Sequence, residues 1–438
     1  MAVTTPTVSD VVDDAIDRLL NGPHRGVVLD SPPGAGKSRA VVRTAVHLAA
    51  AGEPVRVVAQ TNSQVDDLVH RIAEAAPSLS VGRYAAKDYV PPDWLHRPGV
   101  VIRQRLRDLA DVPIVVGTAA KWLDPVVEQR GPWAIIDEAY QMRSDTLLRL
   151  AFIFERALFV GDPGQLDPFS VVNVERWTGL PWNPMQSAVA AMLANNPEIK
   201  PLQLPYSWRL PPSASAPVSA AFYPHVPFQS APEQGPRRMW LPTNGLGGVH
   251  DHAVERAAES GWAYVELPAR HTLRTDAEAV EHVVALAVRT LERGAMVESR
   301  NEPDGAPVRS DRVAIGAVHR DQVAAIKDEL TRVGHPAIRV DTANRLQGAE
   351  FDVVVVLHPL SGRRDATAFH LESGRLCVLT SRHRHACIVV GRAGIAELLD
   401  AHPSVDPVPL NTKPKFPDGW EANHSMLEHL MRHRIRAA

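Results

Sequence analysis

The sequence predicts an α/β fold in which two mostly parallel β-sheets are each flanked by helices. Three observations favour this class. Short apolar runs alternate with amphipathic stretches along most of the chain, which is the pattern of parallel sheets covered by helices. A glycine-rich turn links the first apolar run to a helix. An acidic pair follows a later apolar run, where such sheets bind their ligands.

The first half of the chain carries one set of alternating elements. A helix is expected from about Lys37 to Ala51, and a second over Gln64–Ala75 because its apolar residues recur on one face. Those apolar residues are Val65, Leu68, Val69 and Ile72. Apolar runs bounded by turn residues predict strands at Val27–Leu29, Val55–Ala59, Ile114–Val116, Ala134–Ile136 and Ala157–Val160.

A second set of alternating elements begins near residue 313. It contains a predicted helix over Asp321–Val333. Its strands are expected at Val313–Ala317, Ile338–Val340, Val353–Leu357 and Ala386–Val390. Between the two sets, Pro224–Gly248 is rich in proline and glycine and predicts loops, and Glu298–Arg309 predicts a further exposed loop.

Length and composition fit a globular enzyme that works inside the cell. With 438 residues the chain can form two or three domains, and 45% of its residues are hydrophobic. We see no apolar run long enough to cross a bilayer and no signal-peptide pattern, so we expect no membrane contact. Two cysteines, Cys377 and Cys387, cannot form a disulfide framework, which points to the reducing cytoplasm. A net charge of −3 means that nucleic acid would need a local groove.

The glycine-rich turn reads Ser31-Pro-Pro-Gly-Ala-Gly-Lys-Ser38 and has the strand–loop–helix setting of a phosphate-binding loop. Its glycines let the backbone curl so that its amides point at phosphate oxygens near a helix N-terminus. Lys37 can reach the β- and γ-phosphates of a nucleoside triphosphate, and the Ser38 hydroxyl can bind Mg²⁺. Ser31 replaces the usual first glycine. The residues expected to contact nucleotide are Pro33, Gly34, Ala35, Gly36, Lys37, Ser38 and Arg39.

The acidic pair supplies the chemistry that a phosphate loop alone lacks. Asp137 and Glu138 stand at the carboxyl end of the apolar run Trp133–Ile136. We expect Asp137 to hold Mg²⁺ and Glu138 to orient and deprotonate an attacking water. A solvated carboxylate pair is the simpler alternative, but strand, pair and phosphate loop occur in the expected order. Gln165, in Gly161-Asp-Pro-Gly-Gln-Leu166, follows another apolar run and can sense a γ-phosphate without adding charge.

Taken in order, these motifs and several downstream segments resemble those of superfamily 1 helicases, in the branch typified by the nonsense-mediated-decay RNA helicase (superfamily 1B). The resemblance runs from about residue 26 to residue 391. It implies two RecA-like P-loop NTPase domains, which we place at 1–204 and 205–400, followed by a C-terminal tail with a helix at 401–438. It further implies ATP hydrolysis with Mg²⁺ and 5′-to-3′ movement on single-stranded nucleic acid, DNA or RNA.

The resemblance also assigns roles to single residues of this sequence. Tyr206-Ser-Trp-Arg-Leu210 is similar to the motif that opens the family's second domain, so Trp208 would stack on the nucleotide base and Arg209 would be an arginine finger. Gln347-Gly-Ala-Glu350 resembles the motif linking strand binding to ATP, with Gly348 and Glu350 at the nucleotide. Val378–Arg382 makes Arg382 the second finger. Segments matching the family's backbone-contacting motifs imply nucleic-acid contacts by Thr61, Asn62, Thr118 and Thr342.

Departures from the family leave specific points open. No glutamine occurs before residue 60, so base selectivity for the nucleotide is undecided. Between Leu68 and Gly117 there are too few residues for the family's inserted β-barrel, so strand separation is less firmly implied than ATP hydrolysis. A protein partner would then supply a wedge or regulation. The basic, amphipathic segment Met426–Arg436 favours a packing helix over a binding one.

Alternating His383, His385 and Cys387 raise the question of a metal site. Alternate residues of one strand are poor tetrahedral ligands without distant partners, so packing is the favoured interpretation.

Two further function classes stay open. In the first, the protein is a nucleic-acid-stimulated ATPase switch that remodels a complex without processive unwinding. In the second, it is a small-molecule P-loop phosphotransferase. The second class has no use for the Gln347–Glu350 and Arg382 motifs, which argues against it. ATPase stimulation by single strands would separate the first class from the second.

Overall fold

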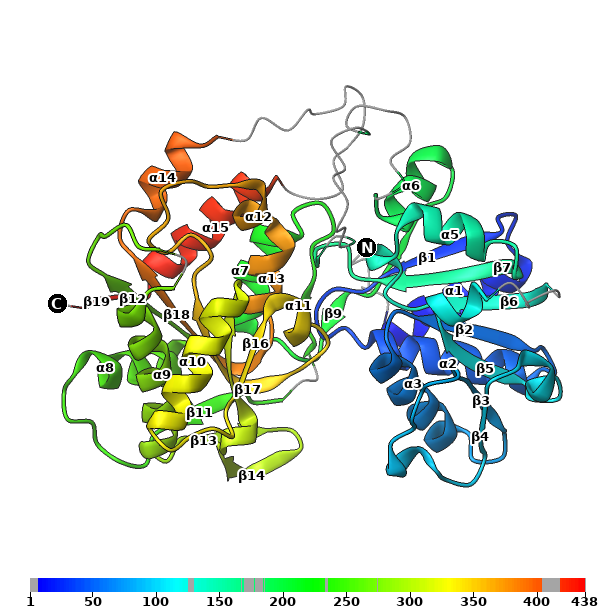
Figure 1. The fold of residues 1–438 in the computed structure, drawn as a ribbon, viewed down its shortest axis with the longest axis horizontal. Helices are drawn as coiled ribbons and strands as arrows, with labels where there is room; N and C mark the ends of the chain where they lie inside the picture. Colours follow the sequence, from blue (N-terminus) through cyan, green and yellow to red (C-terminus); the bar gives the residue numbers. More distant parts are fainter. Residues whose placement is uncertain are drawn as a thin grey trace, which may run out of the picture. The chain divides into compact units, whose positions relative to one another are not determined.

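The computed structural model describes residues 7–124, 130–166, 168, 177, 184, 186–232, 235–273, 275–403 and 418–437. The chain folds into two compact units. Unit 1 comprises Met1–Pro163 and Asp167–Pro205, and unit 2 comprises Gly164–Leu166 and Tyr206–Ala438. Each unit contains a mostly parallel sheet flanked by helices (Figure 1), which confirms the predicted fold class.

Unit 1 is built on one sheet whose neighbouring strands all run parallel in the part of the chain that the structure describes. The strand order is β4-β3-β5-β2-β6-β7-β1-β8. Its central strands are buried on both faces, which explains why they appear in the sequence as continuous apolar runs. The strands are β1 Gly26–Asp30, β2 Val55–Ala59, β3 Val81–Tyr84, β4 Val100–Arg103, β5 Ile114–Thr118, β6 Gly131–Ile136, β7 Phe154–Gly161 and β8 Leu202–Gln203.

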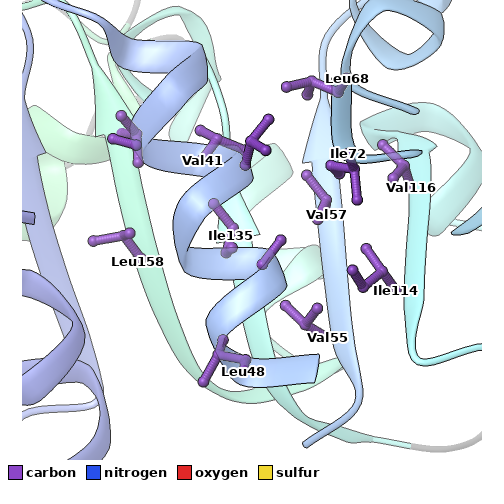
Figure 2. Close-up of a cluster of buried hydrophobic side chains, with 14 of the residues drawn as sticks. Val41, Leu48, Val55, Val57, Leu68, Ile72, Ile114, Val116, Ile135 and Leu158 are labelled. Carbon is purple, nitrogen blue, oxygen red and sulfur yellow. The ribbon is translucent and has the colours of Figure 1, made fainter. Parts of the chain in front are cut away.

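Helices cover the sheet of unit 1 and bury their apolar faces against it. In Figure 2, Val41 and Leu48 of α2 and Leu68 and Ile72 of α3 lie over side chains of β2, β5, β6 and β7. The predicted apolar stripe of α3 is confirmed, because its four residues are all buried. The helices of unit 1 are α1 Val8–Asn21, α2 Lys37–Ala50, α3 Asn62–Ala75, η1 Asp93–Leu95, η2 Leu106–Leu109, α4 Ala119–Trp122, η3 Ala139–Gln141, α5 Ser144–Leu150 and α6 Ala188–Asn195.

Unit 2 contains a second sheet with strand order β16-β15-β17-β18-β12-β19, and each neighbouring pair of these described strands is parallel. The predicted strands of this half are confirmed as β15 to β18. The sequence prediction missed β12 and β19, which complete one side of the sheet. The strands are β12 Trp262–Leu267, β15 Val313–Ala317, β16 Arg339–Thr342, β17 Phe351–Leu357, β18 His383–Arg392 and β19 Arg434–Arg436.

The C-terminal segment is part of the core of unit 2. Helix α15 (Gly419–Met431) buries Ala422, Met426 and Leu430 against the cluster formed with α7 and α13. Strand β19 then pairs with β12. The remaining helices of unit 2 are α7 Pro212–Phe222, α8 Val249–Ser260, α9 Ala277–Glu292, η6 Ser310–Arg312, α10 Arg320–Arg332, α11 Ala343–Leu346, α12 Ala368–Leu371, α13 Ser373–Thr380 and α14 Ile395–Ala401.

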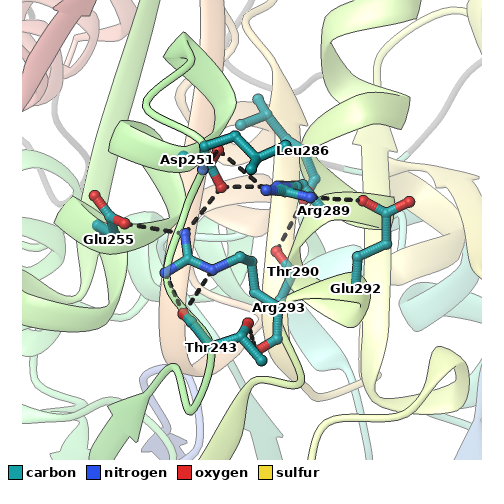
Figure 3. Close-up of polar contacts among 9 residues, drawn as sticks. Thr243, Asp251, Glu255, Leu286, Arg289, Thr290, Glu292 and Arg293 are labelled. Atoms are coloured by element: carbon teal, nitrogen blue, oxygen red, sulfur yellow. Dashed lines mark hydrogen bonds and ion pairs between the residues drawn. The ribbon is translucent and has the colours of Figure 1, made fainter.

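A polar network joins α8 to α9 (Figure 3). Asp251 of α8 accepts hydrogen bonds from Arg289 of α9 at 2.7 and 3.1 Å and from Arg293 at 2.9 Å. Arg293 also donates to the Thr243 carbonyl at 2.7 and 3.0 Å and to Glu255 at 3.0 Å. The hydrogen bonds from Arg289 hold the pKa of Asp251 well below its usual range. The network therefore fixes two helices and a loop around one buried carboxylate.

One loop prediction in unit 2 is wrong, and a second holds for most of its described residues but misses two short strands. The segment Glu298–Arg309 is not one exposed loop, because β13 (Met296–Ser299) and β14 (Glu302–Pro307) form an antiparallel hairpin within it. The predicted loop Pro224–Gly248 contains β10 (Gln229–Ser230), which pairs with β9 (Tyr206–Ser207), and β11 (Arg238–Trp240), which pairs with β13.

Patterning gave no signal for β14, because its residues are exposed or half-buried and lack apolar alternation. Gly305 has φ of 84°, and a Cβ there would lie 2.5 Å from the Trp240 ring. That close approach requires a glycine.

Among the described residues, no helix combines the length and the apolar character that a membrane span requires.

Candidate nucleotide site and nucleic-acid interface

The candidate nucleotide site of unit 1 follows from the order of three neighbouring strands, β6-β7-β1. All three are parallel, so their carboxyl ends lie at one edge of the sheet. Strand β1 leads into the glycine-rich loop, β6 into Asp137 and Glu138, and β7 into Asp162. The Ser31 amide donates to the Gly161 carbonyl at 2.8 Å, which ties the loop to β7. Residues far apart in sequence thus meet at one edge.

The loop between β1 and α2 adopts backbone conformations that favour glycine. Gly34 has φ of 74° and Gly36 has φ of 94°, and Gly36 caps α2. Side chains other than glycine rarely adopt such angles, so the two glycines are needed for the turn itself. Ser31 is buried, and its hydroxyl has no hydrogen-bond partner among the described residues.

Lys37, the first residue of α2, forms ion pairs with both members of the acidic pair. Its Nζ donates to Glu138 Oε1 and lies 3.5 Å from Asp137 Oδ1. Burial disfavours the ammonium, but the carboxylates of Asp137 and Glu138 outweigh it and raise the pKa of Lys37. Burial, together with the charge of Glu138, raises the pKa of Asp137, against the effect of Lys37. The sequence prediction had put these three residues at one site, and in unit 1 they are in contact.

Glu138 is held by an unusual backbone and by a neighbour. With φ of 51°, it is the one described residue other than glycine that has a positive φ. Such strain is often found at functional sites. Its amide donates to Asp137 Oδ1 at 3.0 Å, and its Oε2 accepts from Gln141 Nε2 at 2.9 Å. The carboxylate is therefore gripped from two sides, by Lys37 and by Gln141.

The residues of this site fit a magnesium–nucleotide. A P-loop fold implies a nucleotide and typically a divalent metal. The Ser38 hydroxyl and the Asp137 carboxylate are hard oxygen donors of the kind that Mg²⁺ prefers. Lys37 would supply the cation for the phosphates. The Tyr140 hydroxyl donates to Asp30 Oδ1 at 2.6 Å, which fixes the loop after β6 to the end of β1.

Gln165 belongs to the short segment Gly164–Leu166, which groups with unit 2 while the residues before and after it belong to unit 1. Gln347 Nε2 donates to Gln165 Oε1 at 2.8 Å. A Cβ at Gly374 would lie 2.7 Å from the Gln165 carbonyl carbon, so the close approach of this segment requires glycine at 374. Leu166 is buried in the same core as α7 and α13. Gln165, the predicted γ-phosphate sensor, is thus held by Gln347 of the segment predicted to link strand binding to ATP.

In unit 2, a group of arginines surrounds Glu350 at the amino ends of β17 and β18. Arg209 Nη2 and Arg384 Nη2 each lie 2.8 Å from the Glu350 carboxylate. Arg209 also donates to the Ser381 carbonyl at 3.2 Å. Burial would raise the pKa of Glu350, but Arg209 and Arg384 lower it to about 2. The segments predicted to contact nucleotide from this unit therefore meet, with Glu350 as the ion-pair partner of the predicted finger Arg209.

The other predicted residues of this region lie nearby in unit 2. Arg382 is buried, and its guanidinium donates to the Val378 carbonyl at 3.1 Å and to Ser381 Oγ at 3.0 Å. Trp208 is half-buried, and its carbonyl accepts from Arg237 at 3.0 Å. Gly348 has φ of 81° in the turn before Glu350. The roles of these residues toward a nucleotide stay predictions.

The predicted nucleic-acid contacts of unit 1 share the same sheet edge as the nucleotide site. Thr61 and Asn62 follow β2, and Thr118 ends β5, the neighbouring parallel strand. Thr61 and Thr118 cap helices, since their hydroxyls accept from the amides of Gln64 at 3.3 Å and Lys121 at 3.2 Å. In unit 2, Thr342 ends β16 and precedes α11. The sheet edge formed by β5, β2, β6, β7 and β1 therefore carries two groups of residues. The candidate nucleic-acid contacts lie at or just after the ends of β5 and β2, and the candidate nucleotide-binding residues follow β6, β7 and β1.

Several residues of these sites were missed by sequence reasoning. Gln141 follows the acidic pair by three positions and was given no role, and Arg384 lies two residues after the predicted finger Arg382. Arg83, which donates to the Asn62 side-chain oxygen at 2.8 Å, had no signal except a charge inside the short run Val81–Tyr84. Of the alternating residues on β18, His383 is fully buried and His385 pairs with Asp352 at 3.1 Å. Within the described ranges, no three His, Cys, Asp or Glu residues are grouped so that they could hold a metal.

Comparison with known proteins gives one match on each unit. A family model described as an AAA domain matches residues 12–174, and a second model, also described as an AAA domain, matches residues 255–394. These matches fit one P-loop NTPase domain on each unit. No curated protein sequence matches the chain.

Three solved structures are similar at low identity. The structure of the PRRSV helicase is 15% identical to this chain, with a TM-score of 0.43. The match covers 87% of this chain and 54% of the PRRSV helicase chain. The arterivirus nonstructural protein 10 (helicase) is 14% identical with a TM-score of 0.45, covering 87% and 61%. Its complex with DNA is 14% identical with a TM-score of 0.45, covering 89% and 65%. The chain thus spans between 54 and 65% of the length of these structures.

Proposed function

We propose that this protein is an ATP-dependent, Mg²⁺-requiring nucleic-acid translocase or helicase of superfamily 1, in the branch typified by the nonsense-mediated-decay RNA helicase. The observation that carries the hydrolase part is the contact of Lys37 with Asp137 and Glu138 at the carboxyl edge of one parallel sheet. A structural ion pair would not require a positive φ at Glu138. A phosphate loop and an adjacent acidic pair are the parts that NTP hydrolysis requires.

Each residue then has a defined part in hydrolysis. The loop amides and Lys37 bind the β- and γ-phosphates, and Mg²⁺, held by Ser38 and Asp137, would neutralise charge on them. Glu138 accepts the proton of a water whose oxygen attacks the γ-phosphorus, while the bond to the β–γ bridging oxygen breaks. Before nucleotide binds, Lys37 forms an ion pair with the Glu138 carboxylate. The triphosphate competes for Lys37, so nucleotide binding leaves the Glu138 carboxylate able to act as the base.

Residues of unit 2 stabilise the negative charge that develops on the phosphoryl group in the transition state. Arg209 and Arg382 are the candidate arginine fingers, and such fingers contribute roughly a thousandfold or more to the rate. Trp208, Gly348 and Glu350 contact the nucleotide in this proposal, and Gln165 senses the γ-phosphate. Glu350 holds Arg209 at 2.8 Å before nucleotide arrives.

Single-stranded DNA or RNA is the proposed track, with movement in the 5′-to-3′ direction. Thr61, Asn62 and Thr118 in unit 1 and Thr342 in unit 2 meet its backbone. Hydroxyl and amide groups suit phosphate contacts because they hydrogen-bond without reading bases. Cys377 and Cys387 are both buried and lie outside any disulfide, which agrees with the cytoplasmic location that we propose.

One observation favours a second candidate, an ATPase switch or remodeller that does not unwind processively. The residues between Leu68 and Gly117 complete α3, form the short helices η1 and η2, and contribute β3, β4 and the start of β5 to the main sheet. No inserted barrel is formed in this stretch, so a wedge for strand separation would come from a partner protein.

ATP hydrolysis measured with single-stranded DNA, single-stranded RNA and blunt duplex tests the proposal. We expect stimulation by at least one single strand and poor unwinding of a long blunt duplex by the protein alone. Lys37→Ala, which removes the phosphate-binding cation, is the control for contaminating ATPases. Absence of any response to DNA or RNA would contradict the translocase and the switch together. Efficient unwinding by the isolated protein would exclude the switch.

A further inference from the structure

A buried arginine lies beneath the candidate nucleic-acid contact Asn62. Arg83 of β3 is fully buried, and its Nε donates to Asp66 Oδ1 of α3 at 2.9 Å. Its Nη1 donates to the Tyr84 carbonyl at 2.9 Å. Its Nη2 donates to the side-chain oxygen of Asn62 at 2.8 Å. One guanidinium therefore holds a buried acid, a strand carbonyl and an exposed amide at once.

The ion pair beneath Asn62 is reinforced from a second side. The Tyr89 hydroxyl donates to Asp66 Oδ1 at 2.7 Å, and the Arg83 guanidinium lies over the Tyr89 ring at 4.1 Å from its centroid. Burial and the neighbouring Asp66 carboxylate raise the pKa of Tyr89 to about 12, so the hydroxyl keeps its proton. Asp66 accepts two hydrogen bonds and Arg83 gives three, which leaves the guanidinium little freedom to turn.

The consequence for Asn62 follows from the chemistry of a carboxamide. An amide group has one oxygen that accepts and one NH₂ that donates. Because the Asn62 oxygen accepts from Arg83, its NH₂ is directed away from the buried pair. Asn62 is exposed, at the first position of α3 and at the carboxyl edge of β2. The group that this edge offers is therefore a hydrogen-bond donor, as a phosphate oxygen requires.

We propose that Arg83 is a positioning residue for nucleic acid: held by Asp66, it orients the Asn62 carboxamide so that its NH₂ donates to a backbone phosphate of the bound strand. The inference rests on the proposed function, and it adds the direction in which Asn62 acts and the residues that set this direction. A solely structural role for Arg83 would require the pair with Asp66 alone. The third hydrogen bond, to an exposed side chain, is what links the buried pair to the surface.

Two substitutions at Asn62 test the orientation, because both change a surface side chain. Asn62→Ala removes the donor without adding charge, and we expect about tenfold weaker binding of labelled oligothymidine or oligouridine, the effect of one hydrogen bond to a charged group. Asn62→Asp keeps an oxygen for Arg83 and replaces the outward NH₂ by a carboxylate oxygen, so binding should fall further. An Asn62→Asp variant that binds like the wild type overturns the inference.

A double-mutant cycle tests the part played by Arg83. Arg83→Lys keeps a positive charge beside Asp66, but its compact ammonium cannot span Asp66 and Asn62 at once as the guanidinium fork does. We expect the KM for nucleic acid in the ATPase reaction to rise about tenfold while kcat at saturating nucleic acid is kept. The double variant Arg83→Lys/Asn62→Ala should be no worse than Asn62→Ala, since both remove the same contact. Additive effects, or an unchanged KM in Arg83→Lys, would overturn the proposal.

A matched control and the wild type complete the experiment. Arg71→Lys makes the same exchange in α3, in an exposed pair with Asp67 at 2.7 Å, and should leave the KM for nucleic acid unchanged. A wild-type protein that binds neither oligonucleotide would count against the proposed function itself. A wild type that binds, with Asn62→Ala binding equally well, would count against the orientation alone. Thermal unfolding of each variant identifies any that has lost its fold.

Discussion

Gln347 donates its side-chain N–H to the side-chain oxygen of Gln165 at 2.8 Å, across 182 positions of sequence. The hydrogen bond joins the predicted γ-phosphate sensor to the predicted motif that links strand binding to ATP. It also fixes the orientation of the Gln165 amide, because the oxygen of that amide accepts from Gln347. Gly374 permits this arrangement, since its missing side chain makes room for the Gln165 backbone.

The two glutamines should act as one unit in hydrolysis. On the proposed function, Gln165→Ala is expected to lower kcat about tenfold or more, because a donor to the transferring phosphate is lost. Gln347→Ala should lower kcat by a smaller factor, and the double variant should equal Gln165→Ala. Single-turnover ATP hydrolysis measures each rate. Gln229→Ala, an exposed glutamine in the same unit, is the control. Multiplying losses in the double variant would show that the two act independently.

Glu138 and Lys37 should separate binding from chemistry. Glu138→Gln removes the base but keeps a polar side chain for Lys37 and Gln141. We expect turnover to fall about a hundredfold or more, with ATP still bound. Lys37→Ala should lose nucleotide binding as well, because the phosphates lose their cation. Fluorescent-nucleotide titration beside a phosphate-release assay distinguishes the two. Near-normal turnover by folded Glu138→Gln would remove Glu138 from the role of base.

Arg209 should matter for rate more than for affinity. Arg209→Ala is expected to lower kcat by about a thousandfold with a small change in the KM for ATP, because the charge it answers develops in the transition state. Arg209→Lys should not restore the rate, since a lysine cannot reproduce the fork that now holds Glu350 and Ser381. Arg238→Ala is a suitable control, because that arginine is 75% exposed. Equal losses in kcat and in affinity would argue for a binding role instead.

Acid should destabilise unit 2 through its buried histidines. Burial lowers the pKa of His383 to about 3 and that of His358 to about 4, from 6.5. Unfolded histidines bind protons more readily than these two, so the stability they contribute is present above about pH 6.5 and falls as the pH drops. Between about pH 7 and pH 5, each should cost about 2 kcal/mol of unfolding free energy.

Urea unfolding followed by tryptophan fluorescence at both pH values measures this loss. His383→Phe keeps a ring against Trp262, whose centroid lies 5.0 Å from that of His383. It should recover about 2 kcal/mol of the loss at the lower pH. The exposed His252→Phe should keep the full pH dependence. If His383→Phe loses as much stability as the wild type, His383 does not take up the proton on unfolding.

Local patterns in the sequence were enough to predict the helices and strands that a hydrophobic pattern can encode. The central strands of both sheets are continuous apolar runs, because helices cover both faces of each sheet. A run such as Val353–Leu357 therefore predicts a buried strand directly. The stripe of α3 and the glycines of the phosphate loop were equally direct, since each reflects a local backbone requirement. These elements sufficed to bring Lys37, Asp137 and Glu138 to one sheet edge, because parallel strands end on the same side.

Tertiary structure decided what depends on partners distant in sequence. The hairpin after Met296 lacks apolar alternation, so only its pairing with Trp240 and its neighbours shows that it is not a loop. The direction of the Asn62 amide depends on Arg83, and the hold on Arg209 depends on Glu350 and Ser381. A side chain's hydrogen-bonding direction is set by whichever group meets it in the fold, and this information lies in no local stretch of the chain.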